Sequence, residues 1–403
     1  MTEHRLITSL MRPFFKRGQA TSFSVPGFVG NESNILCLDN GDLAEVLFHI
    51  PLVRALRRRF PGAKIDFLLP EDHAPLIVPS GMARHCIIYK PNQLNPWRPA
   101  FASLLRKLGE GAYDMAVVMA FKPEPRLELA AMASGAALRL GPSHDEAWPS
   151  INFEMKTAAG DESYLGDRLL RTAPFLGLTP EELSLPWPLP VDQVRQVAQQ
   201  VHFHKPNPDQ MLIGVDPTAG KSGRALALEN LLFLVRQINS QLVCKVLPLG
   251  DPAQKQRLEK FETRLSEVPV GLSRETLFEM VMLLSQCDLF LAGNTDFFHF
   301  AVSLGVPTIG LFTAYDEACW IPRRRESVKV LSVAKGEKID IETLMEAVEA
   351  VTGGQTSRPS TIISEPADGS PDADDESADD ESAGEESADE ESADQHESTR
   401  DHD

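Results

Sequence analysis

The stretch ILCLDNGDLAEVLFHIPLVRALRRRFPGAKIDFL, residues 35–68, decides the fold class. It begins with an apolar run, Ile35 to Leu38, and ends in a second one, Ile65 to Leu69. Between the two runs, apolar residues recur at helical spacing from Leu47 to Leu56, with arginines largely on the other side. Strand, helix and strand within about 30 residues are the βαβ signature, which predicts a parallel sheet.

The same pattern continues along both halves of the chain, which are separated by the proline-rich passage LSLPWPLPVD at 183–192. The further predicted strands are 86–89, 115–119, 211–215, 242–249, 289–292 and 308–312, and the further predicted helices are 226–240, 277–285 and 341–351. Two such halves predict an α/β protein with two Rossmann-like, doubly wound domains facing a cleft. Ligands of such sheets bind at the carboxyl ends of the strands. The predicted parts are a leader (1–30), an N-terminal domain (31–182), a linker (183–209), a C-terminal domain (210–352) and a tail (353–403).

The formal charge of −19 is concentrated in the tail. Residues 365–403 hold 18 acidic residues and one arginine, so the other 364 residues carry only −2. Low-complexity acidic repeats cannot bury a core, and we expect the tail to be disordered. It acts either as a self-repelling solubiliser or as a docking segment for a basic partner.

Cysteine usage and hydropathy indicate the compartment. Five scattered cysteines without a CxxC pair argue against a disulfide framework and a zinc site, and HFH at 202–204 has no partners at metal-ligand spacing, so no metal is expected. No apolar run approaches the ~18 residues of a membrane span, and no signal peptide is evident. We expect a cytoplasmic protein. The basic, amphipathic first 20 residues are either a frayed leader or a peripheral contact with the inner membrane surface.

Two blocks carry a family resemblance. Residues 35–68 resemble the opening of the heptosyltransferase-like glycosyltransferases, family 9, in which a strand and a Gly-Asp turn lead to Pro, Leu-Arg and Phe-Pro. The stretch QCDLFLAGNTDFFHFAVSLGVPTIGLFTAYDEACW, residues 286–320, resembles the donor-side segment of that family, and IGVDPTAGKSGRALALENLLFLV, residues 213–235, resembles its Lys-x-Trp-Pro segment. The resemblance covers roughly residues 34–350.

The resemblance implies the two-domain GT-B fold, with an N-terminal acceptor domain and a C-terminal nucleotide-sugar-binding domain. It also implies metal-independent, inverting transfer of a heptose-like sugar from a nucleotide-diphosphate donor resembling ADP-heptose, without a cofactor. The acceptor would be a saccharide or a lipid-linked lipopolysaccharide core at the cytoplasmic face of the inner membrane. No nucleic-acid partner is expected.

The catalytic base is predicted to be one of two carboxylates, Glu45 or Asp42. Removing the proton of an acceptor hydroxyl requires a base. Counting back from Pro51, the family's Gly-Asp falls on Ala44-Glu45, which favours Glu45 over the conspicuous Asp42. The alternative is that Asp42 caps the helix and Glu45 is an acid of its first turn.

Donor-binding candidates follow from the other two blocks. Arg224 falls at the family's Lys position, which implies a contact with the diphosphate, and Lys221 in the preceding turn is a candidate to share or replace that role. The alternative is that both side chains are simply solvated. In the donor segment Asn294-Thr295-Asp296 stands where the family has Asp-Thr-Gly, and His299 follows. These residues are candidates for diphosphate or ribose contacts.

Lys122 and Arg126 are the candidates for acceptor binding, with solvated side chains as the alternative. Two other functions remain open at this point. One is a non-catalytic nucleotide-sugar-binding or scaffold protein, favoured by the altered Gly-Asp and Asp-Thr-Gly sites. The other is a GT-B-shaped sugar-nucleotide epimerase.

Overall fold

A computed structural model describes most of the chain between residues 29 and 353. The described ranges are 29–155, 163–169, 177–178, 187, 189–204, 210–221, 226–265, 272–314, 316–322, 325–333 and 339–353. Most of the predicted leader, Arg224 and nearly all of the acidic tail lie outside them. None of the described helices is long and apolar enough to cross a membrane.

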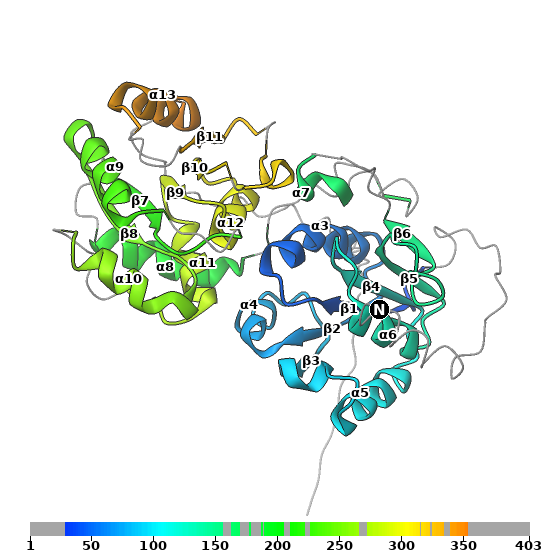
Figure 1. The fold of residues 1–403 in the computed structure, drawn as a ribbon. Helices are drawn as coiled ribbons and strands as arrows, with labels where there is room; N and C mark the ends of the chain where they lie inside the picture. The colour runs from blue at the N-terminus through cyan, green and yellow to red at the C-terminus, as the bar shows by residue number, and fades with distance from the viewer. Residues whose placement is uncertain are drawn as a thin grey trace, which may run out of the picture. The chain divides into compact units, whose positions relative to one another are not determined.

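A six-stranded parallel sheet forms the N-terminal lobe (Figure 1). Its spatial order is β3 (His85–Tyr89), β2 (Lys64–Pro70), β1 (Asn34–Asp39), β4 (Met115–Met119), β5 (Leu138–Pro142) and β6 (Phe153–Met155). The helical elements of this lobe are α3 (Leu43–Arg59), η2 (Glu71–His73), α4 (Ala74–Ile77), η3 (Pro91–Leu94), α5 (Pro99–Gly109), α6 (Pro125–Ala133) and α7 (Leu165–Arg168). Successive residues of β1 belong to different cores: Ile35 packs with α3, and Leu36 packs with α5 and α6. The sheet is therefore covered on both faces, which explains its continuously apolar strands.

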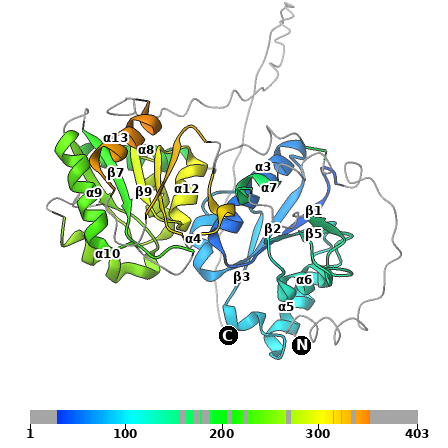
Figure 2. The same cartoon turned by 45° about the horizontal axis from the view of Figure 1, so that its top comes forward.

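A five-stranded parallel sheet forms the C-terminal lobe. Its order is β11 (Val328–Ser332), β10 (Thr308–Phe312), β9 (Leu289–Ala292), β7 (Met211–Asp216) and β8 (Cys244–Pro248). The helical elements are α8 (Val191–His204), α9 (Leu228–Gln241), η7 (Pro252–Gln254), α10 (Lys255–Glu262), α11 (Leu277–Leu284), α12 (Asp296–Leu304), η8 (Ala318–Trp320) and α13 (Ile341–Thr352). Helices α9 and α13 share one core with the sheet, whereas α11 and α12 pack with its other face (Figure 2).

The predicted α/β class with two doubly wound sheets is confirmed, and the predicted strands match the observed ones within two residues. One difference concerns the predicted linker at 183–209, which contains the 14-residue helix α8. The helix packs against α11, with Val201 in the larger core. The HFH sequence at 202–204 forms the end of this helix.

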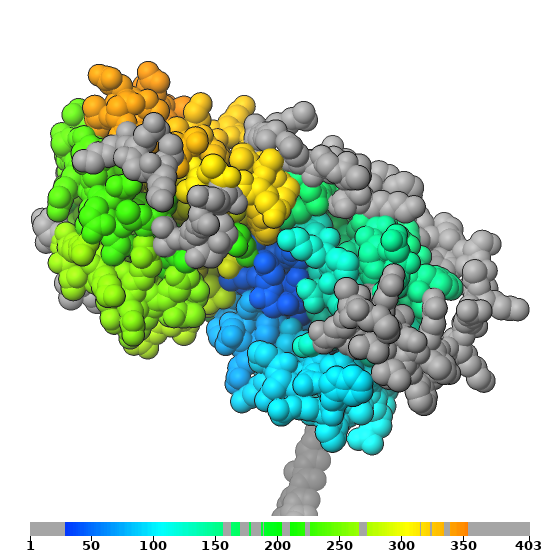
Figure 3. Space-filling model, viewed as in Figure 1, coloured from blue at the N-terminus to red at the C-terminus, as the bar shows by residue number. Residues whose placement is uncertain are grey.

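Helix α3 departs further from its predicted pattern, because it begins at Leu43 and is buried on nearly every side down to Leu56. The second buried side packs against α12 of the C-terminal lobe and against α7. Phe48 lies 5.2 Å from the ring of His299, 5.3 Å from that of Tyr164 and 6.2 Å from that of Trp320, measured between centroids. In Figure 3 the dark blue segment that contains β1 and α3 accordingly lies beside the yellow atoms of the C-terminal lobe.

Candidate functional site

A cavity of about 990 Å³ is lined by residues that follow the carboxyl ends of strands in both lobes. From the N-terminal lobe it receives residues that follow β1, β2 and β4, and from the C-terminal lobe residues that follow β7, β8, β9 and β10. This is the edge at which doubly wound sheets bind ligands. A second cavity of about 430 Å³ lies within the N-terminal lobe and shares Asn40, Gly41, Asp72, His73 and Glu124 with the first.

Glu45 lines the larger cavity from the first turn of α3, and its residue is only 5% exposed. Its Oε2 accepts hydrogen bonds from the backbone N–H of Phe121 (3.0 Å) and from Nδ2 of Asn40 (2.8 Å). Burial raises the pKa of Glu45, the Phe121 N–H opposes the rise, and the charge of Asp42 adds to it. Glu45 is therefore an oriented carboxylate with a proton affinity above that of an ordinary glutamate, as a general base near neutral pH requires.

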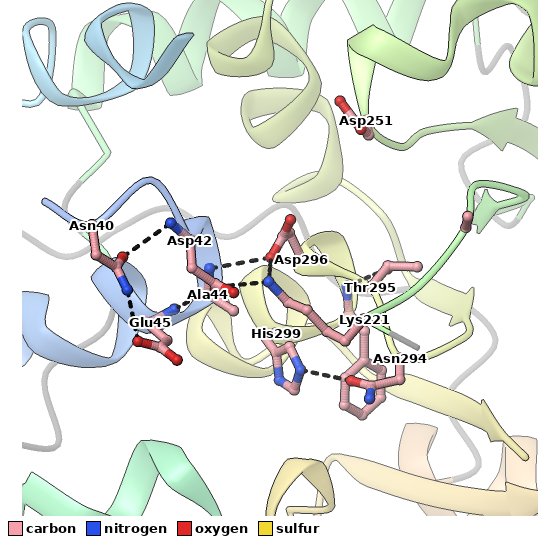
Figure 4. Close-up of polar contacts among 12 residues, drawn as sticks. Asn40, Asp42, Ala44, Glu45, Lys221, Asp251, Asn294, Thr295, Asp296 and His299 are labelled. Atoms are coloured by element: carbon pink, nitrogen blue, oxygen red, sulfur yellow. Dashed lines mark hydrogen bonds and ion pairs between the residues drawn. The ribbon is translucent and has the colours of Figure 1, made fainter. Parts of the chain in front are cut away.

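Asp42 caps α3, as one of the two sequence interpretations predicted. Its Oδ1 accepts a hydrogen bond from the N–H of Glu45 at 3.1 Å. The same oxygen lies 2.7 Å from Nζ of Lys221, which belongs to the other lobe. Figure 4 shows the carboxylate of Glu45 turned toward Asn40, with Asp42 facing Lys221. The two carboxylates of NGDLAE thus have different environments within one helical turn.

Lys221 joins Asp42 to Asp296, with which it forms a second ion pair. Its side chain is 16% exposed, and Nζ lies 5.4 Å from the ring centroid of Trp320. Burial lowers the pKa of Lys221, but the two carboxylates outweigh burial and raise it, so the amine stays charged at neutral pH. Asp296 also accepts a hydrogen bond from the N–H of Ala44 at 3.1 Å, so polar contacts link the lobes at the cavity wall.

The remaining donor-segment candidates are divided between the cavity and the core. Asn294 lines the cavity and its Oδ1 lies 3.1 Å from Nε2 of His299. Thr295 is buried and caps α12 by accepting from the N–H of Phe298 at 3.2 Å. His299 is fully buried, and its Nδ1 lies 3.1 Å from the hydroxyl of Tyr164. Burial, assisted by the charge of Lys221, holds the pKa of His299 well below its ordinary value, so the imidazole is neutral. The structure places Asn294 at the cavity and puts Thr295 and His299 behind its wall.

The acceptor candidates lie at different cavities. Lys122 is exposed and lines the larger one, whereas Arg126 lines the smaller one. Arg224 is among the residues outside the described ranges. Within those ranges no group of three or more His, Cys, Asp or Glu side chains has a geometry suited to a metal ion.

A buried histidine–aspartate pair was missed by the sequence reasoning. Asp39 ends β1 and is fully buried, and its Oδ2 lies 2.6 Å from Nδ1 of His73. Burial lowers the pKa of His73, but the hydrogen bond to Asp39 and the negative charge of Asp39 raise it by more than burial lowers it. The pKa of His73 is therefore above its ordinary value. His73 lines both cavities. The available signal was that Asp39 directly follows the predicted strand 35–38, whereas His73 lies four residues after the predicted strand 65–69.

Glu124 is a second residue missed from sequence. It precedes α6 and lines both cavities. Burial raises the pKa of Glu124 to about 7, with further contributions from the charges of Glu45 and Glu128. Carboxylates with strongly shifted pKa values concentrate at functional sites. Glu124 is therefore a candidate functional residue at the place where the two cavities meet.

Comparisons with known proteins agree with this geometry. The family model described as glycosyltransferase family 9 (heptosyltransferase) matches residues 101–348. No curated protein matches the sequence significantly.

Solved structures with the same fold include a glycosyltransferase of family 9 from Veillonella parvula (TM-score 0.63, 17% identity, covering 79% of this chain and 97% of that one). They also include ADP-heptose lipopolysaccharide heptosyltransferase II of E. coli (TM-score 0.59, 18% identity, covering 79% of this chain and 98% of that one). A third is E. coli heptosyltransferase WaaC with ADP (TM-score 0.56, 15% identity, covering 78% of this chain and 99% of that one). At these identities the likeness shows the fold, which is GT-B. Because the family model covers more than half of the sequence, the chain belongs to glycosyltransferase family 9, a family of sugar-transferring enzymes.

Proposed function

We propose that this enzyme transfers a heptose-like sugar from a nucleotide-diphosphate donor resembling ADP-heptose to a saccharide or lipopolysaccharide-core acceptor. The reaction is inverting and independent of metal, and takes place at the cytoplasmic face of the inner membrane. The observation that carries the proposal is the cavity between the two sheets, where the oriented carboxylate of Glu45 stands on one lobe and Lys221 on the other.

In the proposed reaction, the acceptor oxygen forms a bond to the anomeric carbon while the bond from that carbon to the diphosphate oxygen breaks. Glu45 takes the proton of the acceptor hydroxyl. The departing diphosphate carries away the bonding electrons, and Lys221 compensates its growing negative charge. A single displacement of this kind inverts the anomeric configuration. Metal independence rests on the family resemblance.

A non-catalytic nucleotide-sugar-binding protein is the second candidate. One observation favours it: Lys221, the best-placed cation for a diphosphate, is already paired with Asp42 and Asp296. A donor would have to compete with these carboxylates, and a chain that binds its nucleotide sugar without turnover is compatible with that arrangement.

Glu45→Gln tests the proposal. The purified full chain is incubated with ADP-heptose and heptose-deficient lipopolysaccharide core, and the variant should transfer about 10²–10⁴-fold more slowly because it has lost the base. Its affinity for the donor should stay close to that of the parent. Glu71→Gln is the matched control, since Glu71 lines the same cavity with a side chain that is 60% exposed. Transfer by Glu45→Gln at the rate of the control contradicts the assigned role.

The donor is identified separately by thermal-shift measurements with ADP, GDP, UDP and CDP sugars. A ligand at about 100 times its dissociation constant adds about 2.7 kcal/mol to the free energy of unfolding. Binding without transfer by the parent supports the non-catalytic candidate. Conversion of the nucleotide sugar in the absence of acceptor supports a third candidate, an epimerase. No shift with any nucleotide sugar contradicts donor binding altogether.

A further inference from the structure

The carboxylate of Asp296 lies in a contact between the lobes at the wall of the larger cavity. Its Oδ1 accepts a hydrogen bond from the backbone N–H of Ala44 at 3.1 Å and forms an ion pair with Nζ of Lys221. The side chain of Asp296 is 32% exposed and lines the cavity. Figure 4 shows its carboxylate in contact with Ala44 and Lys221. A single oxygen therefore engages both a main-chain donor of one lobe and a cation of the other.

These two donors have the chemistry of a phosphate site. Ala44 is the second residue of the 17-residue helix α3, so its N–H has no acceptor within the helix. The neighbouring N–H of Glu45 is taken by Asp42, which leaves that of Ala44 for a partner from outside the helix. A helix N-terminus together with a lysine binds phosphate oxygens through N–H groups and positive charge.

The rest of the cavity does not favour an anion. Among its described lining residues there are ten carboxylates, and Lys122 and Lys221 are its lysines. Lys122 is exposed to solvent, whereas Lys221 is held in place with a side chain that is 16% exposed. A diphosphate entering this cavity therefore finds its strongest attraction at Lys221, where Asp296 already lies.

We propose that Asp296 occupies the subsite of one donor phosphate and that the diphosphate must displace it to reach Lys221 and the N–H of Ala44. A carboxylate and a phosphate cannot accept from the same N–H, and two like charges in contact repel each other. Asp296 thus acts as a built-in competitor that sets the affinity for the donor and selects for ligands with more negative charge. This inference rests on the proposed use of a nucleotide-diphosphate donor.

A purely structural role for Asp296 predicts the opposite binding behaviour. If the ion pair only held the lobes together, its loss would loosen the site and weaken binding of any ligand that spans the cavity. If Asp296 is a competitor, its removal frees the N–H of Ala44 and leaves Lys221 paired with Asp42 alone, which strengthens anion binding. The sign of the change in affinity therefore separates the two roles.

The test compares the full-length parent with Asp296→Asn and Asp296→Ala by isothermal titration with ADP, inorganic pyrophosphate and inorganic phosphate. The alanine variant is needed beside the asparagine variant, because the asparagine side-chain oxygen can still accept a hydrogen bond from the N–H of Ala44. Asp72→Asn is the matched control, because it removes one exposed negative charge from the same cavity and Asp72 has no hydrogen bond to Lys221 or Ala44. Thermal unfolding of each protein verifies that it is folded.

Asp296→Ala should bind ADP and pyrophosphate roughly 10-fold or more tightly than the parent, since a charge-assisted contact is worth about that factor. The control should change affinity by less than about threefold. Unchanged or weaker binding by both Asp296 variants overturns the inference. Tighter pyrophosphate binding without ADP binding by any of the proteins supports the inference and contradicts the proposed donor instead.

A second test uses the parent chain alone, so that its outcome does not depend on how the variants fold. Pyrophosphate, at concentrations that saturate the titration, should shift the backbone amide resonance of Ala44 in an NMR spectrum, because the acceptor of that N–H changes. An unshifted Ala44 resonance at saturation also overturns the inference.

Discussion

Replacing Lys221 with methionine should destabilise the protein, because it leaves Asp42 and Asp296 facing each other without a cation. Methionine preserves much of the aliphatic volume and the contact with Trp320. An exposed ion pair contributes about 0–1 kcal/mol, whereas breaking a buried one costs about 3–5 kcal/mol. The Lys221 side chain is 16% exposed and the two aspartates 33% and 32%, so this site lies between these limits. We expect a loss of about 1–3 kcal/mol, which corresponds to roughly 2–12 °C in Tm.

The pH dependence of that loss provides a second measurement. Burial already raises the pKa of Asp296, and Lys221 opposes the rise. In Lys221→Met the pKa of Asp296 should rise further above the unfolded value of about 3.9. A carboxyl whose pKa is raised in the folded state favours folding below its unfolded pKa and loses that contribution as pH rises through the folded pKa. The deficit of the variant should therefore be greatest at neutral pH and shrink in acid.

The assay is thermal and urea unfolding of the full chain across this pH range, with Lys122→Met as control. Lys122 is an exposed lysine of the same cavity, so its replacement should change stability by less than about 0.5 kcal/mol. The double variant that also carries Asp296→Asn should recover part of the loss, because it removes one of the opposed charges. A Tm for Lys221→Met equal to that of the control, with an unchanged pH profile, refutes the reasoning.

Two further predictions concern the loops around the cavity. The pKa of His73 is raised by Asp39 despite burial, so this pair stabilises the fold fully below about pH 6.5 and loses its contribution as pH rises through the folded pKa. In urea titrations the stability difference between the parent and His73→Asn should accordingly diminish above that pH, and a pH-independent difference would contradict the assignment. Gly220→Ala should lower the free energy of unfolding by about 1–3 kcal/mol, because a Cβ there would collide with the backbone oxygen of Asn294. The control is Gly30→Ala, whose Cβ would meet nothing within 4 Å. It should be nearly neutral in the same thermal unfolding measurement.

The elements that could be predicted from sequence are those whose signal is local. Continuous apolar runs such as Met115–Met119 identify strands that are buried on both faces, and the observed β4 has those bounds. The helix predicted at 341–351 is likewise observed as α13, where Asp340 accepts a hydrogen bond from the N–H of Thr343 and caps the first turn. In each case the residues that make the structure lie within a few positions of one another.

The extent of burial on α3 was harder to predict. Its arginines suggested a solvated side, yet the helix is buried from Leu43 to Leu56 except for the half-buried Pro51 and Arg54. The exposed arginines 57–59 lie in its last turn. Periodicity describes how a helix faces its own sheet, and it carries no information about a second lobe that packs on the opposite side. Glu45 in the first turn is also held by a contact distant in sequence, because its carboxylate accepts from the N–H of Phe121 after β4.

The sequence by itself determined the parallel α/β architecture, the family and the pair of carboxylates in NGDLAE, because strand runs, helical spacing and turn residues act over short distances. Only the tertiary structure decided what those carboxylates contact. Asp42 is committed to a helix cap and to Lys221, 179 positions away, and Asp296 reaches Ala44 across 252 positions. Such contacts form where the two lobes, each with its own sheet, pack against each other. Spacing along the chain does not encode which residues of the two lobes meet there.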